Sequence, residues 1–206
     1  MTKVKICGLR RLDDVDAVNR VLPDFVGFVF AASHRQVDAA TAARLRERLD
    51  ERIAAVGVFV NQDVEFIEAL WRDGVIRLAQ LHGDEDGGYI QRLRERCGCA
   101  VIKTISICVG ADSGSAWPVL PAHADYLLFD TASSARGGVG KTFDWCVLAA
   151  YQGPPYFLAG GLSAANVAEA IGALSPFGVD VSSGVETDGV KDAAKIEQFV
   201  RLCRTT

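Results

Sequence analysis

The sequence predicts an α/β fold, a closed (β/α)8 barrel of parallel strands in which residues 1–206 form one domain. Short apolar or β-branched runs alternate with amphipathic stretches along the whole chain, and there are eight such runs. This gives one strand and helix per ~26 residues, which is compact but sufficient for a barrel. The runs are apolar on both faces, as a parallel sheet covered by helices requires. A doubly wound open sheet produces a similar alternation, but the count of eight favours the barrel.

The expected elements follow one another without a linker or a low-complexity tract. The strands are expected at Val4–Cys7, Phe25–Phe30, Ala55–Val60, Leu78–Leu81, Val101–Ile105, Tyr126–Phe129, Tyr156–Ala159 and Val179–Val181. The helices are expected at Leu12–Val21, Ala39–Arg52, Val64–Asp73, Asp86–Cys97, Asn166–Leu174 and Lys191–Leu202. The fifth and sixth units are the weakest, because residues 110–124 are rich in Gly, Ser and Pro and the helix after Phe143 is short.

Composition excludes several classes of function. The chain is 50% hydrophobic and can bury a full core. Its net charge of -4, its pI near 5.4 and the lack of a Lys/Arg run argue against nonspecific binding of nucleic acid. No apolar run approaches the ~20 residues of a membrane span, and the first residues enter a strand pattern without room for a signal peptide. We therefore expect a cytoplasmic protein that binds neither nucleic acid nor a membrane.

The six cysteines are scattered, and we expect them to be reduced thiols. Cys97-Gly98-Cys99 lacks the two-residue spacing of a zinc knuckle, and the chain has only three histidines. No metal site is therefore expected.

The carboxyl ends of the strands form the active face of such a barrel, so the residues there are the site candidates. Cys7 ends the first strand, where it is either a small packing residue or, if its pKa is lowered, a base or a nucleophile. Spacing alone does not separate these two roles. Arg35 lies in the loop after the second strand, where its guanidinium can take a carboxylate or simply face solvent.

The fourth to sixth strands add further candidates. His82 lies just past the fourth strand, and it either faces the ligand or supports a neighbouring residue. Asp84 is predicted to cap the next helix. Lys103 interrupts an apolar strand, so it must reach the mouth of the barrel or pair with a carboxylate. Asp130 ends the sixth strand, and together with Cys7 it gives separate acid and base groups facing one cavity.

The segment Gly137-Gly138-Val139-Gly140-Lys141-Thr142 invites comparison with a nucleotide-binding loop. That loop needs a glycine six residues before the lysine, and Ala135 stands there. We therefore reject the nucleotide-binding interpretation. A glycine loop that closes over the substrate fits better, with Lys141 anchoring it or facing the ligand.

The last two strands run directly into small residues. Tyr156–Ala159 is followed by Gly160-Gly161, and Val179–Val181 is followed by Ser182-Ser183-Gly184. Small residues let backbone N–H groups approach an anion, and a following helix N-terminus adds partial positive charge. Each junction alone is compatible with a tight turn, but two in succession predict a phosphate site and hence a small phosphorylated substrate.

With these motifs in order, the chain resembles the phosphoribosylanthranilate isomerase family, single-domain TIM barrels of tryptophan biosynthesis. The matching stretches are Lys-Ile-Cys-Gly-Leu at 5–9, Gly-Phe-Val-Phe at 27–30 with Ser33 and Arg35, Gln-Leu-His-Gly-Asp-Glu at 80–85, Leu-Phe-Asp-Thr at 128–131, Gly-Gly-Val-Gly-Lys-Thr-Phe-Asp-Trp at 137–145, Leu-Ala-Gly-Gly-Leu at 158–162 and Gly-Val-Asp-Val-Ser-Ser-Gly-Val-Glu at 178–186. They span nearly the whole chain.

The resemblance implies an Amadori rearrangement without metal or cofactor, the third stage of tryptophan synthesis from chorismate. N-(5-phosphoribosyl)anthranilate would become 1-(2-carboxyphenylamino)-1-deoxyribulose 5-phosphate. By the same resemblance, Asp130 would be the general acid, Cys7 the general base, and Arg35 the group that holds the anthranilate carboxylate. The remaining substrate-binding candidates are Gly160, Gly161, Ser182 and Ser183 at the phosphate, Asp180 at the sugar, and His82 without a defined role. Family members occur as a monomer or a homodimer.

Four positions depart from the family pattern, namely His34, Gln36, Val139 and Asp188. None is a presumed acid, base or phosphate group, so we expect them to affect efficiency and not the reaction. The alternatives are another phosphosugar barrel, a nucleotide-binding or regulatory module, and a catalytically dead barrel that serves as a scaffold. The Cys7 and Asp130 pair argues against the scaffold and, among the phosphosugar barrels, against a phosphoribosyl-formimino isomerase, which uses a carboxylate pair. The three histidines do not supply the metal ligands that a ribulose-phosphate epimerase needs.

Overall fold

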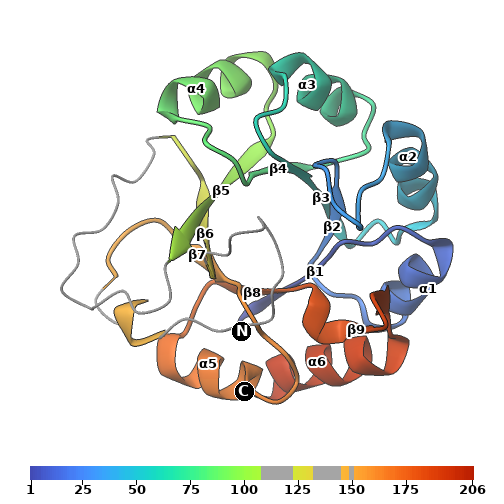
Figure 1. Ribbon diagram of the computed structural model, residues 1–206, viewed down its shortest axis with the longest axis vertical. Helices are drawn as coiled ribbons and strands as arrows, with labels where there is room; N and C mark the ends of the chain where they lie inside the picture. Colours follow the sequence, from blue (N-terminus) through green and yellow to red (C-terminus); the bar gives the residue numbers. More distant parts are fainter. Residues whose placement is uncertain (108–122, 132–144, 149–150) are drawn as a thin grey trace.

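Eight parallel strands close into a barrel in sequence order, with β1 paired to both β2 and β8 (Figure 1). The computed structural model describes residues 1–107, 123–131, 145–148 and 151–206. The strands are β1 (Lys3–Cys7), β2 (Phe25–Val29), β3 (Ala54–Phe59), β4 (Leu78–Leu81), β5 (Ala100–Ile107), β6 (Tyr126–Thr131), β7 (Tyr156–Leu158) and β8 (Gly178–Val181). The predicted barrel is therefore confirmed, and each predicted strand differs from the observed one by no more than two residues at either end.

Helices form the outer ring of the barrel (Figure 1). Within the described residues they are α1 (Leu12–Val21), α2 (Ala39–Arg48), α3 (Val64–Arg72), α4 (Gly87–Arg96), α5 (Val167–Leu174) and α6 (Ala193–Thr205). Two 3-10 turns, η1 (Trp145–Leu148) and η2 (Ser183–Val185), and the short strands β9 (Glu186–Thr187) and β10 (Val190–Lys191) complete the elements. None of the helices in these ranges is long and apolar enough to cross a membrane.

Three expectations about helix ends were wrong, one of them at α6, which was predicted at Lys191–Leu202 and spans Ala193–Thr205 because Lys191 belongs to β10. The predicted cap Asp84 does not start α4, because its backbone N–H donates to Asn61 Oδ1 at 2.8 Å in a turn before the helix. Asp86 caps α4 instead, accepting from the Tyr89 N–H at 2.8 Å. The helix α2, predicted to end at Arg52, ends at Arg48, because the side chain of Asn19 on α1 donates a hydrogen bond to the Arg48 carbonyl.

The barrel interior divides into an apolar floor and a polar mouth. The floor is a buried cluster of Val56, Leu78, Ile102, Leu128, Phe157 and Ala159. Because strand side chains alternate between faces, the residue two positions further along a strand faces the same interior. Leu78 is thus followed by Gln80 and His82, and Leu128 by Asp130. The apolar floor closes one end of the barrel and leaves the other end for chemistry.

Candidate active site

A cavity of about 220 Å³ opens among the carboxyl ends of the strands. It is lined by six of the nine predicted site residues, namely Cys7, Arg35, His82, Asp130, Asp180 and Ser182, together with Val29, Ala31, Ala32, Ser33, Val58, Val60 and Gln80. The other three predicted residues do not line this cavity: Gly160 and Gly161 lie in the loop after β7, and Ser183 begins η2 after β8. The structure thus brings one thiol, two carboxylates, one imidazole and one guanidinium around an apolar wall.

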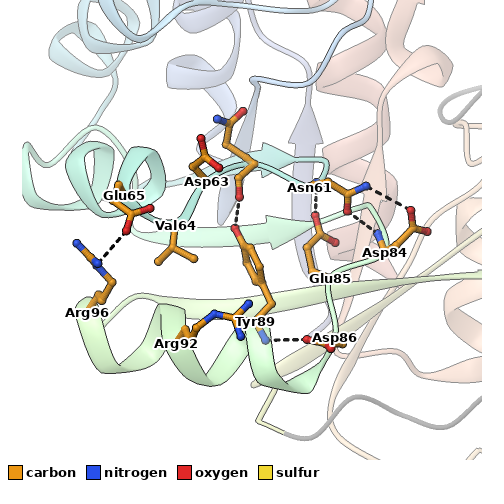
Figure 2. A pocket seen from close by; sticks show the side chains of 11 residues that line it. Asn61, Asp63, Val64, Glu65, Asp84, Glu85, Asp86, Tyr89, Arg92 and Arg96 are labelled. Atoms are coloured by element: carbon orange, nitrogen blue, oxygen red, sulfur yellow. Dashed lines mark hydrogen bonds and ion pairs between the residues drawn. The ribbon is translucent and has the colours of Figure 1, made fainter.

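A larger depression of about 500 Å³ lies elsewhere, between the start of α3 and one side of α4 (Figure 2). None of the predicted site residues lines it. Some of its charged side chains form ion pairs with one another, such as Arg96 Nη1 and Glu65 Oε1, which lie 2.8 Å apart. The candidate active site is therefore the cavity at the mouth of the barrel, where the groups suited to acid and base chemistry converge.

Cys7 lies at the end of β1, two residues beyond the buried cation Lys5. The Lys5 side chain is fully buried, and its Nζ donates to Asp180 Oδ1 at 3.0 Å across the β1–β8 pair. Burial raises the pKa of the Cys7 thiol above its usual range, and the Lys5 charge opposes that rise. Burial alone would lower the pKa of Lys5, but the charges of Asp180 and Cys7 and the hydrogen bonds to them together outweigh burial and raise the pKa. Lys5 therefore remains a cation under the site.

Asp130 extends from β6 into the same cavity. Burial, reinforced by the charge of Asp180, raises the pKa of Asp130 to about 6. A carboxylic acid with a pKa in this range can donate a proton near neutral pH, which an ordinary aspartate cannot do efficiently. The backbone N–H of Thr131 donates to Asp130 Oδ1 at 2.8 Å and fixes the carboxyl group.

His82 stands close to this acid, with 3.8 Å between His82 Nε2 and Asp130 Oδ2. Burial, with a contribution from the charge of Lys5, lowers the pKa of His82 to about 4. The ring is therefore neutral at pH 7, and the pair is not an ion pair. Gln80 Nε2 lies 3.2 Å from His82 Nδ1. The side-chain NH2 of Gln80 donates to Nδ1, so Nδ1 is the unprotonated ring nitrogen. The ring proton is then on Nε2, the nitrogen that faces Asp130.

The loop that carries His82 is held from outside the barrel by a buried ion pair. Lys103 Nζ lies 3.1 Å from Glu85 Oε2 and also donates to the carbonyl of Gly83 at 2.8 Å. Glu85 in turn accepts from the backbone N–H groups of Asn61 and Gly83 at 2.7 and 2.9 Å, the former drawn in Figure 2. Of the two predicted alternatives for Lys103, the pairing with a carboxylate is confirmed.

The loops after β7 and β8 touch one another. Gly160 and Gly161 both have positive φ, at 83° and 67°, and a Cβ at Gly160 would collide with Thr131 Oγ1. A Cβ at Gly184 would collide with the carbonyl of Leu162. These loops therefore need glycine for their conformation and close packing, as an anion site built from backbone groups requires.

The polar residues at the mouth include groups that can carry out acid and base chemistry. Among residues 1–107, 123–131, 145–148 and 151–206, no group of three or more His, Cys, Asp or Glu side chains is arranged to hold a metal ion. The cavity instead combines a raised-pKa acid, a thiol and a cationic edge at Arg35.

Comparison with known proteins decides which family has this arrangement. The sequence model described as N-(5′phosphoribosyl)anthranilate (PRA) isomerase matches residues 4–202. The chain belongs to this family. It is 48% identical to the N-(5′-phosphoribosyl)anthranilate isomerase of Endomicrobium trichonymphae, over 100% of both chains. It is 43% identical to that of Clostridium acetobutylicum, over 99% of this chain and 98% of the relative.

Solved structures of PRA isomerases share the barrel. The enzyme of Thermotoga maritima superposes with a TM-score of 0.85 at 35% identity, over 100% of both chains. Monomers generated from that dimeric enzyme superpose at 0.82 and 33% identity, also over 100% of both chains. Another PRA isomerase, in complex with reduced 1-(o-carboxyphenylamino)-1-deoxyribulose 5-phosphate, superposes at 0.81 and 30% identity over the same shares. The family and fold implied by the sequence resemblance are confirmed, while the roles of individual residues stay predictions.

Residues with a clear place at the site were missed in the sequence. Lys5, Gln80 and Glu186 stand within the PRA isomerase motifs and Lys191 follows them, but the sequence pattern predicts no role for any of the four. A charged residue two positions before Cys7 in an apolar strand shares its face, which is the signal that could have found Lys5. Buried Gln80 Oε1 has no partner among the described residues and leaves an acceptor at the cavity. The proposed glycine loop with Val139 and Lys141 lies outside the described residues.

Proposed function

We propose that residues 1–206 act as one isomerase domain that converts N-(5-phosphoribosyl)anthranilate to 1-(2-carboxyphenylamino)-1-deoxyribulose 5-phosphate, with Asp130 as acid and Cys7 as base. The observation that carries the assignment of roles is the shared cavity, which Cys7 and Asp130 both line from different strands. The biosynthetic character of the family supports a cytoplasmic location, and its solved members support a monomer or a homodimer.

Ring opening is the step assigned to Asp130. The protonated carboxyl gives its proton to the ring oxygen of the ribose while the bond from C1′ to that oxygen breaks, and the anilino nitrogen supplies the electron pair. The product is a protonated Schiff base, and Asp130 is left as a carboxylate. The raised pKa of Asp130, about 6, supports this role because it keeps a useful fraction of the acid protonated.

Cys7 then takes the proton from C2′. The electrons of that C–H bond form the double bond between C2′ and C1′, and the electrons of the imine return to nitrogen. The resulting enolamine tautomerises to the ketone. Lys5 supports this role, because a cation beside the thiol favours the thiolate over the thiol.

Binding of the substrate is assigned to the rest of the mouth. Gly160, Gly161, Ser182 and Ser183 would hold the phosphate, Arg35 the carboxylate of the aromatic ring, and Asp180 the sugar. His82 lines the cavity as a neutral ring and would serve as a hydrogen-bonding group and not as a cation.

The test is turnover of freshly prepared N-(5-phosphoribosyl)anthranilate, followed by the loss of its fluorescence, in wild type and in Cys7→Ala. We expect the variant to lose ~10²- to 10⁴-fold in kcat while it keeps its affinity for the substrate, since a general base contributes on this scale. Cys203→Ala is the matched control, because it removes a buried thiol on α6, away from the cavity.

The wild-type pH profile provides a second check. The active form needs protonated Asp130 and ionised Cys7, although the pKa of the acid, about 6, lies below that of the base. The population of that form is then constant between the two pKa values and falls on either side. Wild-type turnover in Cys7→Ala would remove Cys7 from the mechanism, and no turnover by wild type would contradict the proposed function.

A further inference from the structure

Arg35 does not enter the cavity as a free guanidinium. Its Nε donates to Glu186 Oε1 at 2.8 Å and its Nη2 to Glu186 Oε2 at 2.7 Å, a parallel pair of bonds along one edge of the guanidinium. Both side chains are largely buried, with 10% and 7% of their surfaces exposed. Arg35 lines the cavity and Glu186 does not. Glu186 therefore lies behind the arginine, as seen from the cavity.

Glu186 binds only one edge of the Arg35 guanidinium and leaves a second edge without a bond to Glu186. A guanidinium carries five N–H donors in a planar fork, and a carboxylate that binds through Nε and Nη2 takes only two of them. The Nη1 group and the second hydrogen of Nη2 form another edge that matches a carboxylate. Arg35 can therefore hold two carboxylates at once, one from the protein and one from a ligand.

The stem of Arg35 is constrained as well. It passes over Gly8, where a Cβ would come within 2.5 Å of Arg35 Cδ, and Gly8 has a φ of 85°. The backbone N–H of Arg35 donates to Ser33 Oγ at 3.2 Å. With the stem against Gly8 and the guanidinium against Glu186, the plane of the fork has little freedom.

Glu186 is itself held in place. Lys191 Nζ donates to Glu186 Oε1 at 2.6 Å and to the carbonyl of Ser182 at 2.9 Å. Burial alone would raise the pKa of Glu186, but the hydrogen bonds from Arg35 and Lys191 outweigh it and lower the pKa to about 2. Glu186 is thus an anion at every working pH. The three-residue group carries a net charge of +1, so it still attracts an anionic ligand.

We propose that Glu186 is a positioning residue that grips the back edge of Arg35 and thereby presents the front edge to the carboxylate of the substrate's aromatic ring. The proposal rests on the function proposed above. It assigns to Glu186 the discrimination between an arylamine with a neighbouring carboxylate and one without it. The opposite role, a protein carboxylate that competes with the substrate for Arg35, predicts effects of the opposite sign.

The test uses calorimetric binding of two reduced product analogues, 1-(2-carboxyphenylamino)-1-deoxyribitol 5-phosphate and its phenylamino counterpart without the carboxylate. In Glu186→Gln the amide keeps one acceptor for Arg35 but loses the charge and the paired bond. We expect the Kd of the carboxylated analogue to rise ~10- to 100-fold, as for loss of a well-placed charged hydrogen bond. The Kd of the other analogue should change less than ~3-fold.

Two further variants complete the design. Glu186→Asp keeps the charge on a shorter stem, so it should fold and lose a smaller part of the discrimination. Asp16→Asn breaks an exposed, doubly bonded pair with Arg48 and should change neither Kd. Equal weakening of both analogues in Glu186→Gln and Glu186→Asp, no change, or tighter binding of the carboxylated analogue would each overturn the proposal. Wild-type turnover is measured in parallel, so failure of the proposed function is seen separately.

Discussion

Replacing the candidate acid Asp130 with Asn should stabilise the protein at high pH, although it should also abolish turnover. The pKa of Asp130 is raised from 3.8 to about 6, so the folded protein binds this proton more tightly than the unfolded chain does. The stabilisation from protonation is complete below pH 3.8 and is lost as the pH rises through 6. At pH 8 the wild type therefore carries the whole cost of an ionised, buried carboxylate.

The size of this cost follows from the two pKa values. One pKa unit corresponds to about 1.4 kcal/mol, so a rise from 3.8 to about 6 corresponds to about 3 kcal/mol. Asn keeps an oxygen for the Thr131 N–H but loses the stronger bond to a charged acceptor, so we expect a net gain of about 1–3 kcal/mol. For a chain of this length that corresponds to about 2–4 °C in Tm per kcal/mol.

The assay is urea unfolding of wild type and Asp130→Asn at pH 8, 6 and 4. The gain should be largest at pH 8, smaller at pH 6 and close to zero at pH 4, where the wild-type carboxyl is protonated. Asp38→Asn provides the control, because it makes the same chemical change at the exposed cap of α2, where Asn caps equally well. A variant that is no more stable than wild type at pH 8, or a gain independent of pH, would refute the reasoning.

Two further predictions concern stability. Lys103→Met should lower the free energy of unfolding, measured in urea, by about 3 kcal/mol, because it leaves buried Glu85 without its cation. The control Lys3→Met breaks an exposed pair with Asp24 and should cost less than about 1 kcal/mol. Equal costs would contradict a stabilising role for the buried Lys103–Glu85 pair. Gly160→Ala should lower both Tm and turnover, because Gly160 has a positive φ and the added Cβ would collide with Thr131. Gly172→Ala on α5 is the control, because a Cβ there meets nothing within 4 Å, and it should raise the free energy of unfolding by about 0.5–1 kcal/mol. Similar Tm shifts in the two alanine variants would contradict the special need for glycine at position 160.

The strands could be predicted because each is a short apolar run that ends in polar or small residues. The positions of Cys7, His82 and Asp130 at the mouth followed from the same pattern, because the carboxyl ends of parallel strands meet at one face. The end of α2 could not be predicted, because it is set by a residue distant in sequence. Asn19 Nδ2 donates to the carbonyl of Arg48 at 2.9 Å, and Asn19 Oδ1 accepts from Asp50 N–H at 3.0 Å.

Ionisation states at the site were harder to predict than positions. The sequence left two roles open for Cys7, and burial raises its pKa where a reactive thiol would need a lower one. Only the three-dimensional neighbourhood shows that Lys5 opposes this rise. In the same way, Arg35 was expected to hold a carboxylate, but the pattern gave no sign that Glu186 already occupies one edge of it.

The pairing of β1 with β8 has a consequence for synthesis of the chain. Lys5 and Asp180 are separated by 175 positions, yet each is the buried partner of the other. At translation rates of about 5–20 residues per second, roughly 9 to 35 seconds separate their appearance. During that interval a lysine destined for the interior has no counter-charge and must stay hydrated. The nascent chain therefore cannot close its barrel early, and a ribosome that stops before the eighth strand releases a product without a functioning centre.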